Sequence, residues 1–219
     1  MTLQATTDTD TDTEAGQLIS AAREMSIELS LAQAEKLLTL LDLLADWNQR
    51  VNLTAIRDRA EMVRKHLLDS LSVQPFIQGP VVIDVGTGAG FPGLPLAVVN
   101  PELRFVLLDS TAKKLAFVSH AAEVLGLGNV EVVHARAEKY EPSSRATTVI
   151  TRAFGALRLM VEQAGGLVAR SGRLLAMKGR VPTEEMDNLP HAWRVTAVEA
   201  LRVPGLDGER HLVVLERRH

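Results

Sequence analysis

The sequence predicts an α/β fold: a doubly wound, mostly parallel seven-stranded sheet preceded by an N-terminal helical extension. From residue 79 onward, short segments rich in β-branched residues alternate with helical stretches, which is typical of a parallel sheet with right-handed crossovers. A glycine-rich loop directly follows the first of these segments, where such sheets bind their ligands. The length of 219 residues fits one large domain, and a composition of 46% hydrophobic and 23% charged residues excludes a disordered or fibrous protein.

Three parts are expected along the chain. Residues 1–15 should be a disordered acidic tail, because residues 6–14 (TTDTDTDTE) contain no apolar residue and no base. An acidic interaction arm is the alternative interpretation of this tail. Residues 16–78 should form the helical extension, and residues 79–219 should form the ligand-binding domain.

The extension contains two predicted helices. The first begins after Ser30, since Ser30 and Gln33 have the spacing of a capping box and leucines then recur with helical periodicity. The second covers Arg59–Val73 and ends before a proline. His66 in this helix stands beside two leucines, so we expect it to be a partly buried structural residue.

Seven strands are predicted in the ligand-binding domain. They are Val81–Val85, Arg104–Leu108, Asn129–His134, Thr147–Thr151, Arg173–Met177, Arg194–Val198 and His211–Leu215. Helices are predicted between them at Leu94–Val99, Ala112–Leu125 and Leu157–Ala169. The last two strands are separated by a turn rich in Pro, Gly and Asp, without a helix, so they should form an antiparallel hairpin.

The glycine loop runs from Gly86 to Gly93 (GTGAGFPG) and directly follows the apolar segment VVIDV. Glycines allow the chain to turn sharply and its backbone to approach a ligand closely. Phe91 stands where a dinucleotide site has its third small residue, and no Gly-Lys-Ser/Thr follows, which excludes a P-loop. Between Val81 and Arg104 the charged residues are all acidic, so a cofactor without phosphate fits better. A purely structural turn is the alternative.

Asp109 ends the second predicted strand, 21 residues after Gly88. A carboxylate at this place can accept both hydroxyls of a ribose, as in sites for nicotinamide dinucleotides and for S-adenosylmethionine. Capping of the following helix is the alternative role of Asp109. The loop and the carboxylate together predict a nucleoside-containing cofactor.

The chain contains no cysteine, which excludes disulfides and leaves only His and carboxylates for a metal site, and we expect no metal. The absence of cysteine also excludes covalent attack on a pyrimidine ring by a thiolate. No run of about 18 apolar residues and no export signal occur, so we expect a cytoplasmic protein without a membrane partner. Nothing in the sequence demands more than a monomer.

Several motifs together resemble one protein family. The string DVGTGAGFPGLPLA and the downstream LLDS-x-x-KK resemble the cofactor motifs of class I S-adenosylmethionine-dependent methyltransferases. More narrowly, they resemble the RsmG (GidB) family, which methylates N7 of a guanine in 16S rRNA of the small ribosomal subunit. HLLDSL at residues 66–71, RAE at 136–138, TRA at 151–153, AMKG at 176–179 and GERHLVV at 208–214 also correspond. The family often begins its fourth strand with an Asp after an aromatic residue, whereas Ala146-Thr147-Thr148 stand here.

This resemblance implies a Rossmann-like fold that binds S-adenosyl-L-methionine and acts in rRNA processing on 16S rRNA, the small subunit or an assembly intermediate of it. Asp109 would meet the ribose, Ala137 and Glu138 the adenine, and Gly86 with Phe91 the methionine. Arg152 would lie near the methionine end or the target base. The cofactor-binding residues implied are Gly86, Gly88, Phe91, Asp109, Ala137, Glu138 and Arg152.

Formation of N7-methylguanosine needs no acid–base residue, so none is predicted to be catalytic. Guanine N7 already carries an available lone pair, and the reaction then depends on proximity and alignment. No Asn/Asp-Pro-Pro-aromatic string follows the fourth strand, where amino-group methyltransferases have one. The alternatives are an S-adenosylmethionine-dependent methyltransferase for another RNA or a small molecule, a nicotinamide-dependent oxidoreductase and a non-enzymatic nucleotide-binding module.

The charge distribution bears on an RNA partner. A formal net charge of −3 and a pI near 6.1 argue against nucleic acid at first sight. However, residues 1–14 contain four acids and no base, whereas residues 143–183 contain seven bases and one acid. We therefore expect salt-sensitive RNA binding in which cations contact phosphates and an aromatic ring stacks on a base. The residues expected to contact RNA are Arg152, Phe154, Lys178 and Arg180.

Overall fold

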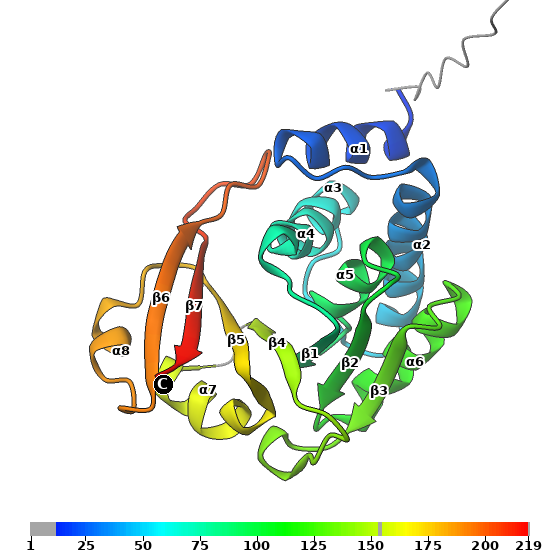
Figure 1. Cartoon of the computed structure of the whole chain (residues 1–219). Helices are drawn as coiled ribbons and strands as arrows, with labels where there is room; N and C mark the ends of the chain where they lie inside the picture. Colours follow the sequence, from blue (N-terminus) through cyan, green and yellow to red (C-terminus); the bar gives the residue numbers. More distant parts are fainter. Residues whose placement is uncertain (1–11, 153–154, 219) are drawn as a thin grey trace, which may run out of the picture.

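The computed structural model describes residues 12–152 and 155–218, and its centre is a seven-stranded sheet with the order β3-β2-β1-β4-β5-β7-β6. Strands β1 to β5 are parallel to one another, and β7 lies antiparallel between β5 and β6. The predicted fold class and the C-terminal hairpin are therefore confirmed (Figure 1). The strands are β1 (Val81–Val85), β2 (Arg104–Asp109), β3 (Val130–His134), β4 (Ala146–Arg152), β5 (Val168–Lys178), β6 (Trp193–Ala200) and β7 (His211–Arg217).

Helices precede the sheet and connect its strands. They are α1 (Glu14–Glu24), α2 (Leu31–Asn48), α3 (Arg59–Met62), α4 (Asp69–Leu71), α5 (Gly93–Val99), α6 (Ala112–Val124), α7 (Leu157–Ala164) and α8 (Thr183–Asp187). Between α3 and α4 the chain forms a π-helical turn, η1 (Val63–Leu68). Short 3-10 turns are η2 (Gln74–Phe76), η3 (Ala137–Lys139) and η4 (Gly165–Leu167). None of the described helices is long and apolar enough to cross a membrane.

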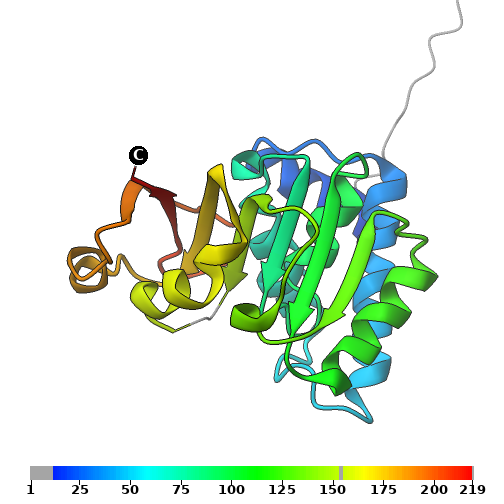
Figure 2. The same cartoon turned by 60° about the horizontal axis from the view of Figure 1, so that its bottom comes forward.

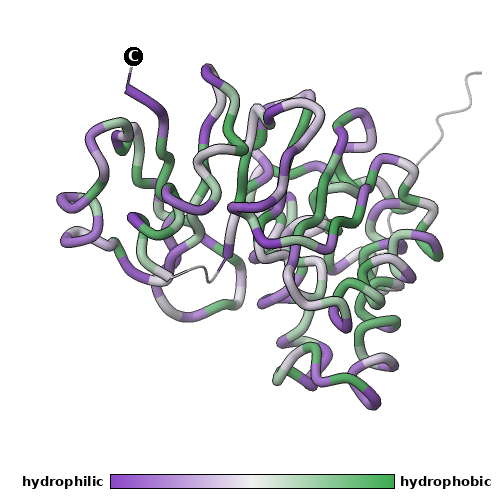
Figure 3. The backbone as a smooth tube through the Cα atoms, turned by 90° about the horizontal axis from the view of Figure 1, so that it is seen from below, coloured by the Kyte–Doolittle hydropathy of each residue, from purple (hydrophilic) through white to green (hydrophobic). Residues whose placement is uncertain are grey.

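The alternation of side chains along the strands creates two apolar cores. Val82, Phe105 and Ile150 face the N-terminal helices with α5 and α6, whereas Ile83 and Val149 face α7. Figures 1 and 2 show these two helical layers on opposite faces of the sheet. Apolar segments run through the centre of the molecule and hydrophilic segments lie around its rim (Figure 3). The helical extension is thus part of one of the two cores.

The extension begins earlier than predicted. Helix α1 begins at Glu14 because Thr13 caps it, its hydroxyl accepting a hydrogen bond from the Gly16 N–H at 3.0 Å. Glu14 also forms an ion pair with Arg59 at 2.7 Å. The last residues assigned to the acidic tail are therefore helical, and residues 1–11 lie outside the described part. Helix α2 begins with the predicted capping box at Ser30 and Gln33.

One predicted helix end is wrong. The helix expected over Leu157–Ala169 ends at Ala164, where the Gly165-Gly166 pair interrupts it. Strand β5 then begins at Val168, five residues before the predicted strand. The apolar residues at positions 167–169 that suggested helix instead enter the sheet.

Strand β4 pairs with β5 so that Arg152 lies beside Met177, next to Lys178 at the same edge of the sheet. At the opposite end of this pair, the register shifts between Ala146 and Thr148. Gly172 comes so close to β4 there that a Cβ would lie 2.8 Å from the carbonyl oxygen of Ala146. Because the obstacle is backbone, only a movement of the strands could make room.

We therefore expect Gly172→Ala to lower the free energy of unfolding by about 1–3 kcal/mol. The matched control is Gly166→Ala, since a Cβ at Gly166 meets nothing within 4 Å and the backbone there has no positive φ. The control should change the free energy by no more than about 0.5 kcal/mol. Urea denaturation of the two variants measures both values, and equal stabilities would contradict the close approach.

Candidate active site

Asp84, a fully buried carboxylate in β1, holds the glycine loop at both ends. Its Oδ2 accepts hydrogen bonds from the Thr87 hydroxyl at 2.6 Å and from the Gly93 N–H at 2.9 Å. Burial raises the pKa of Asp84 to about 6, against the effect of these two hydrogen bonds. A Cβ at Gly93 would collide with Leu107 and lie 2.8 Å from Asp84 Oδ2, so the loop can pack this tightly only with glycine.

Asp109, at the end of β2, joins the middle of the loop to the start of α6. Its Oδ2 accepts a hydrogen bond from the Gly88 N–H at 2.9 Å, and its Oδ1 accepts one from the Thr111 N–H at 2.8 Å. Asp109 therefore ties the glycine loop to Thr111, the residue before α6, and its contact with a ribose stays a prediction. A carboxylate has about four acceptor sites, so these two bonds leave capacity for a ligand.

A cavity of about 230 Å³ lies outside the carboxyl ends of β1, β2 and β3. The cavity extends from β1, beside which the strand order reverses, and open α/β sheets bind ligands outside these carboxyl ends. Four of the predicted cofactor residues line it: Gly86, Asp109, Ala137 and Glu138. The whole lining is Val85, Gly86, Leu108, Asp109, Ser110, Ala135, Arg136, Ala137, Glu138 and Gln163.

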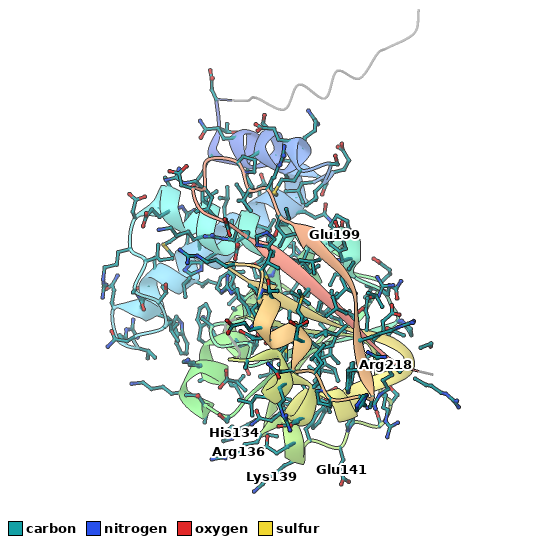
Figure 4. All side chains as sticks on the ribbon, turned by 90° about the vertical axis from the view of Figure 1, so that its left-hand side faces the viewer. His134, Arg136, Lys139, Glu141, Glu199 and Arg218 are labelled. Carbon is teal, nitrogen blue, oxygen red and sulfur yellow. The ribbon has the colours of Figure 1, made fainter. Side chains whose placement is uncertain are left out.

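The residues around this cavity, which we call the first cavity, fit a nucleoside. Asp109 and Glu138 supply carboxylate acceptors, while Val85 and Leu108 supply apolar surface. Gly88 has a φ of +61°, and a Cβ there would meet only a carbonyl oxygen at 3.9 Å, so the loop leaves open space beside it. Figure 4 shows Arg136 close to His134 and Lys139 and far from Glu199.

Six lining residues were not assigned to the cofactor site from the sequence: Val85, Leu108, Ser110, Ala135, Arg136 and Gln163. Ser110 directly follows Asp109, and Arg136 directly precedes Ala137, so adjacency to predicted residues was the available signal. Gln163 comes from α7. This helix packs on the face of the sheet opposite to α5, the helix that follows the glycine loop. No local pattern indicates which face of α7 reaches the cavity, because this depends on how the helix packs.

Phe91 has a different surrounding from the first cavity. Its ring is buried and stacks on His66, with the ring centroids 4.9 Å apart and an interplanar angle of 28°. The guanidinium carbon of Arg152 lies 5.9 Å from the Phe91 centroid. The Phe91 side chain therefore packs against His66 in η1 and lies near Arg152 in β4. It does not line the first cavity.

His66 is buried, as expected. Its Nε2 lies 3.0 Å from the Thr54 hydroxyl, and its Nδ1 has no partner among the described residues. Burial, together with the positive charges of Arg152 and Lys65, lowers the pKa of His66 to about 4. His66 is therefore neutral near pH 7.

A second cavity, also of about 230 Å³, lies at the carboxyl ends of β4 and β5. Arg152 lines it and donates from Nη1 to Asp69 Oδ2 at 3.2 Å and to the Lys65 carbonyl at 3.3 Å. Lys178 lines it too and forms an ion pair with Glu185 at 2.8 Å. Its lining residues are Asp69, Arg152, Met177, Lys178, Gly179, Leu201, Arg210 and His211.

The remaining residues predicted to contact RNA lie nearby in the sequence. Arg180 is exposed and follows the cavity residue Gly179 directly. Phe154 lies outside the described residues. The structure thus brings Arg152 and Lys178 together and separates them from the first cavity, where four of the predicted cofactor residues lie.

Comparisons with known proteins agree with this architecture. Residues 33–213 match the family described as rRNA small subunit methyltransferase G. A protein of that name from Marinobacter nauticus is 48% identical over 202 residues, covering 92% of this chain and 94% of its own length. Another, from Ectopseudomonas mendocina, is 47% identical over 209 residues, covering 94% of this chain and 98% of its own.

A solved structure gives the fold independently. The S-adenosylmethionine-dependent methyltransferase from Geobacter sulfurreducens, in complex with S-adenosyl-L-homocysteine, matches with a TM-score of 0.52 at 13% identity. The match covers 69% of this chain and 90% of that one. The fold and the loop with its strand-end carboxylate define an S-adenosylmethionine-dependent methyltransferase of class I. More narrowly, the chain belongs to the rRNA small subunit methyltransferase G family, as its motifs predicted.

The buried state of His66 predicts a pH effect on stability. Because its pKa falls from 6.5 unfolded to about 4 folded, the unfolded state binds more protons in this window and stability rises with pH. The unfolding free energy of the wild type minus that of His66→Gln should therefore increase from pH 4 to pH 6.5, by up to about 1.4 kcal/mol per pH unit. Denaturant titrations across this range measure it, and a constant difference would refute it.

Proposed function

We propose that this protein transfers the methyl group of S-adenosyl-L-methionine to N7 of a guanine in the 16S rRNA of the small ribosomal subunit. The observation that carries the proposal is the pair of cavities at one edge of the sheet. The first offers two carboxylates and a glycine loop, and the second offers the cations Arg152, Lys178 and Arg210. A nucleoside cofactor fits the first, and an anionic polymer fits the second.

The cofactor is proposed to lie in the first cavity with its nucleoside toward the ends of β2 and β3. Asp109 would accept the ribose hydroxyls, and Ala137 with Glu138 would contact the adenine. Gly86 and Gly88 would let the backbone approach the methionine part. When bound, S-adenosylmethionine supplies a methyl group attached to a positively charged sulfonium. Transfer of the methyl group leaves the sulfur as a neutral thioether.

The protein's own contribution is alignment. Guanine N7 is nucleophilic without deprotonation, so no side chain has to remove a proton. Orientation of two reactants can contribute about 7–11 kcal/mol in favourable systems. Arg152 is proposed to contact the methionine end or the target guanine, and Phe91 supports it from below through the contact at 5.9 Å. Lys178, Arg180 and Phe154 are proposed to hold the surrounding RNA.

The other candidate functions have less support. A nicotinamide dinucleotide needs its pyrophosphate at the glycine loop, but this loop carries the bulky Phe91 and no base nearby in the sequence. A binding module without activity gives no reason for a basic cavity beside the cofactor site. The protein is further proposed to act as a monomer in the cytoplasm, with the small subunit or an assembly intermediate as its partner.

The function is tested on undermethylated small subunits and their naked rRNA with methyl-labelled S-adenosylmethionine. Mass-spectrometric mapping should place the label on N7 of one guanine in 16S rRNA. The same nucleotide should lose its N7-methylguanosine in a strain that lacks the gene. Unchanged N7-methylguanosine in that strain, or binding of NAD without binding of S-adenosylmethionine in calorimetry, would overturn the proposal.

Asp109→Asn should weaken S-adenosylmethionine binding about tenfold or more, because the ribose loses a charged acceptor and the loop loses its charged anchor. The matched control is Glu199→Gln, which removes an exposed carboxylate far from Arg136 in Figure 4. The control should bind as the wild type does. Isothermal titration measures both, and wild-type affinity of Asp109→Asn would exclude the proposed ribose contact.

A further inference from the structure

Asp69, from α4 of the helical extension, lies between two arginines that are distant in sequence: Arg152 at the end of β4 and Arg210 directly before β7. Its Oδ2 accepts from Arg152 Nη1 at 3.2 Å, and its Oδ1 accepts from Arg210 Nε at 3.1 Å. Only 9% of the Asp69 side chain is exposed, while Arg152 and Arg210 are exposed by 26% and 28%. One buried carboxylate thus orients two guanidinium groups that line the second cavity.

The charges of the second cavity do not balance. Arg152, Arg210 and Lys178 line it, and Asp69 is its one acidic lining residue. Glu185 neutralises Lys178 from outside the lining. One positive charge therefore remains after all these partners are counted. This uncompensated positive charge in the cavity lining suits an anionic ligand.

Each guanidinium also keeps unused donors. The hydrogen bonds of Arg152 involve Nη1, and those of Arg210 involve Nε and Nη1. Within the described part of the chain, Nε and Nη2 of Arg152 and Nη2 of Arg210 have no protein partner. Two fixed guanidiniums with free N–H groups in one cavity match the geometry in which a phosphate oxygen pair is bound.

We propose that Asp69 is a positioning residue that sets Arg152 and Arg210 so that both bind one phosphodiester of the RNA substrate in the second cavity. The proposal rests on the proposed function and names Arg210 as a further RNA contact. It also gives the helical extension a part in the reaction, since Asp69 reaches from that extension to Arg152 in β4 and to Arg210 directly before β7. The apolar Met177 and Leu201 in the lining would face the sugar or base next to this phosphate.

The test compares wild type with Asp69→Asn, Asp69→Glu and Arg210→Gln on undermethylated small subunits. Asp69→Asn removes a negative charge near the RNA, so a merely electrostatic Asp69 predicts tighter binding in the variant. If Asp69 instead positions the two guanidinium groups, Asp69→Asn should have a kcat at least about tenfold lower and should not bind RNA more tightly. Asp69→Glu should restore part of kcat, because it keeps the carboxylate.

The salt dependence of RNA binding tests the phosphate contact without any methyl transfer. Arg210→Gln should lower the slope of log affinity against log salt by about 0.7–1, the value for one lost phosphate contact. The matched control is Asp42→Asn, which removes a carboxylate that pairs with Arg59 at 2.9 Å in the same helical extension, outside the lining of either cavity. The control should keep the wild-type slope and kcat.

Two results would overturn the proposal. One is an Arg210→Gln protein whose slope of log affinity against log salt equals that of the wild type. This result would refute the phosphate contact even if Asp69→Asn does not fold. The other is an Asp69→Asn protein that melts at a lower temperature but keeps its kcat when assayed in the folded state. A wild type that binds RNA with the expected slope but does not methylate it would refute the proposed function and leave the phosphate site standing.

Discussion

The parallel pairing of β1 with β2 on one side and β4 on the other is the constraint on which the site depends. Parallel strands all end at the same edge of the sheet, so three residues distant in sequence lie along that edge: Asp84, Asp109 and Arg152. The chain must reverse its direction of winding at β1, which leaves a crevice between the two halves. The glycine loop follows β1 into this crevice, and Asp84 fixes its shape from below.

Three carboxylates hold the site together by accepting hydrogen bonds from backbone or guanidinium groups. Asp84 and Asp109 each accept a hydrogen bond from a loop N–H, and Asp69 accepts from two arginines. Removing one partner of such a buried group leaves a charge without compensation, which is costly. These three acids therefore restrict the loop and the arginines to one arrangement each. Such restriction is what a reaction that depends on alignment requires.

Much of the fold and of the glycine-loop site could be predicted because short stretches of sequence determine them. Strand positions follow from β-rich segments, and the loop with Asp109 follows from motif spacing, and both were found within a few residues. Contacts between residues that are distant in sequence leave no such local pattern. That Gln163 reaches the first cavity, or that Asp69 meets Arg210 at a separation of 141 residues, depends on the packing of whole elements. The end of α7 was misplaced for a similar reason, since apolar residues after a glycine pair suit a helix and a buried strand equally.

His66 and Asp84 show how the site's burial affects the whole protein. Burial favours the neutral form of each group, so the pKa of His66 falls to about 4 and that of Asp84 rises to about 6. Between these values the folded state binds fewer protons than the unfolded state at His66 and more at Asp84. Raising the pH therefore stabilises the fold through His66 and destabilises it through Asp84. The two effects oppose each other in the same window, so stability can stay nearly level in mild acid although both groups are strongly perturbed. A flat pH profile of the wild type would then reflect compensation between two buried groups that both contact the glycine loop, and single substitutions separate their effects.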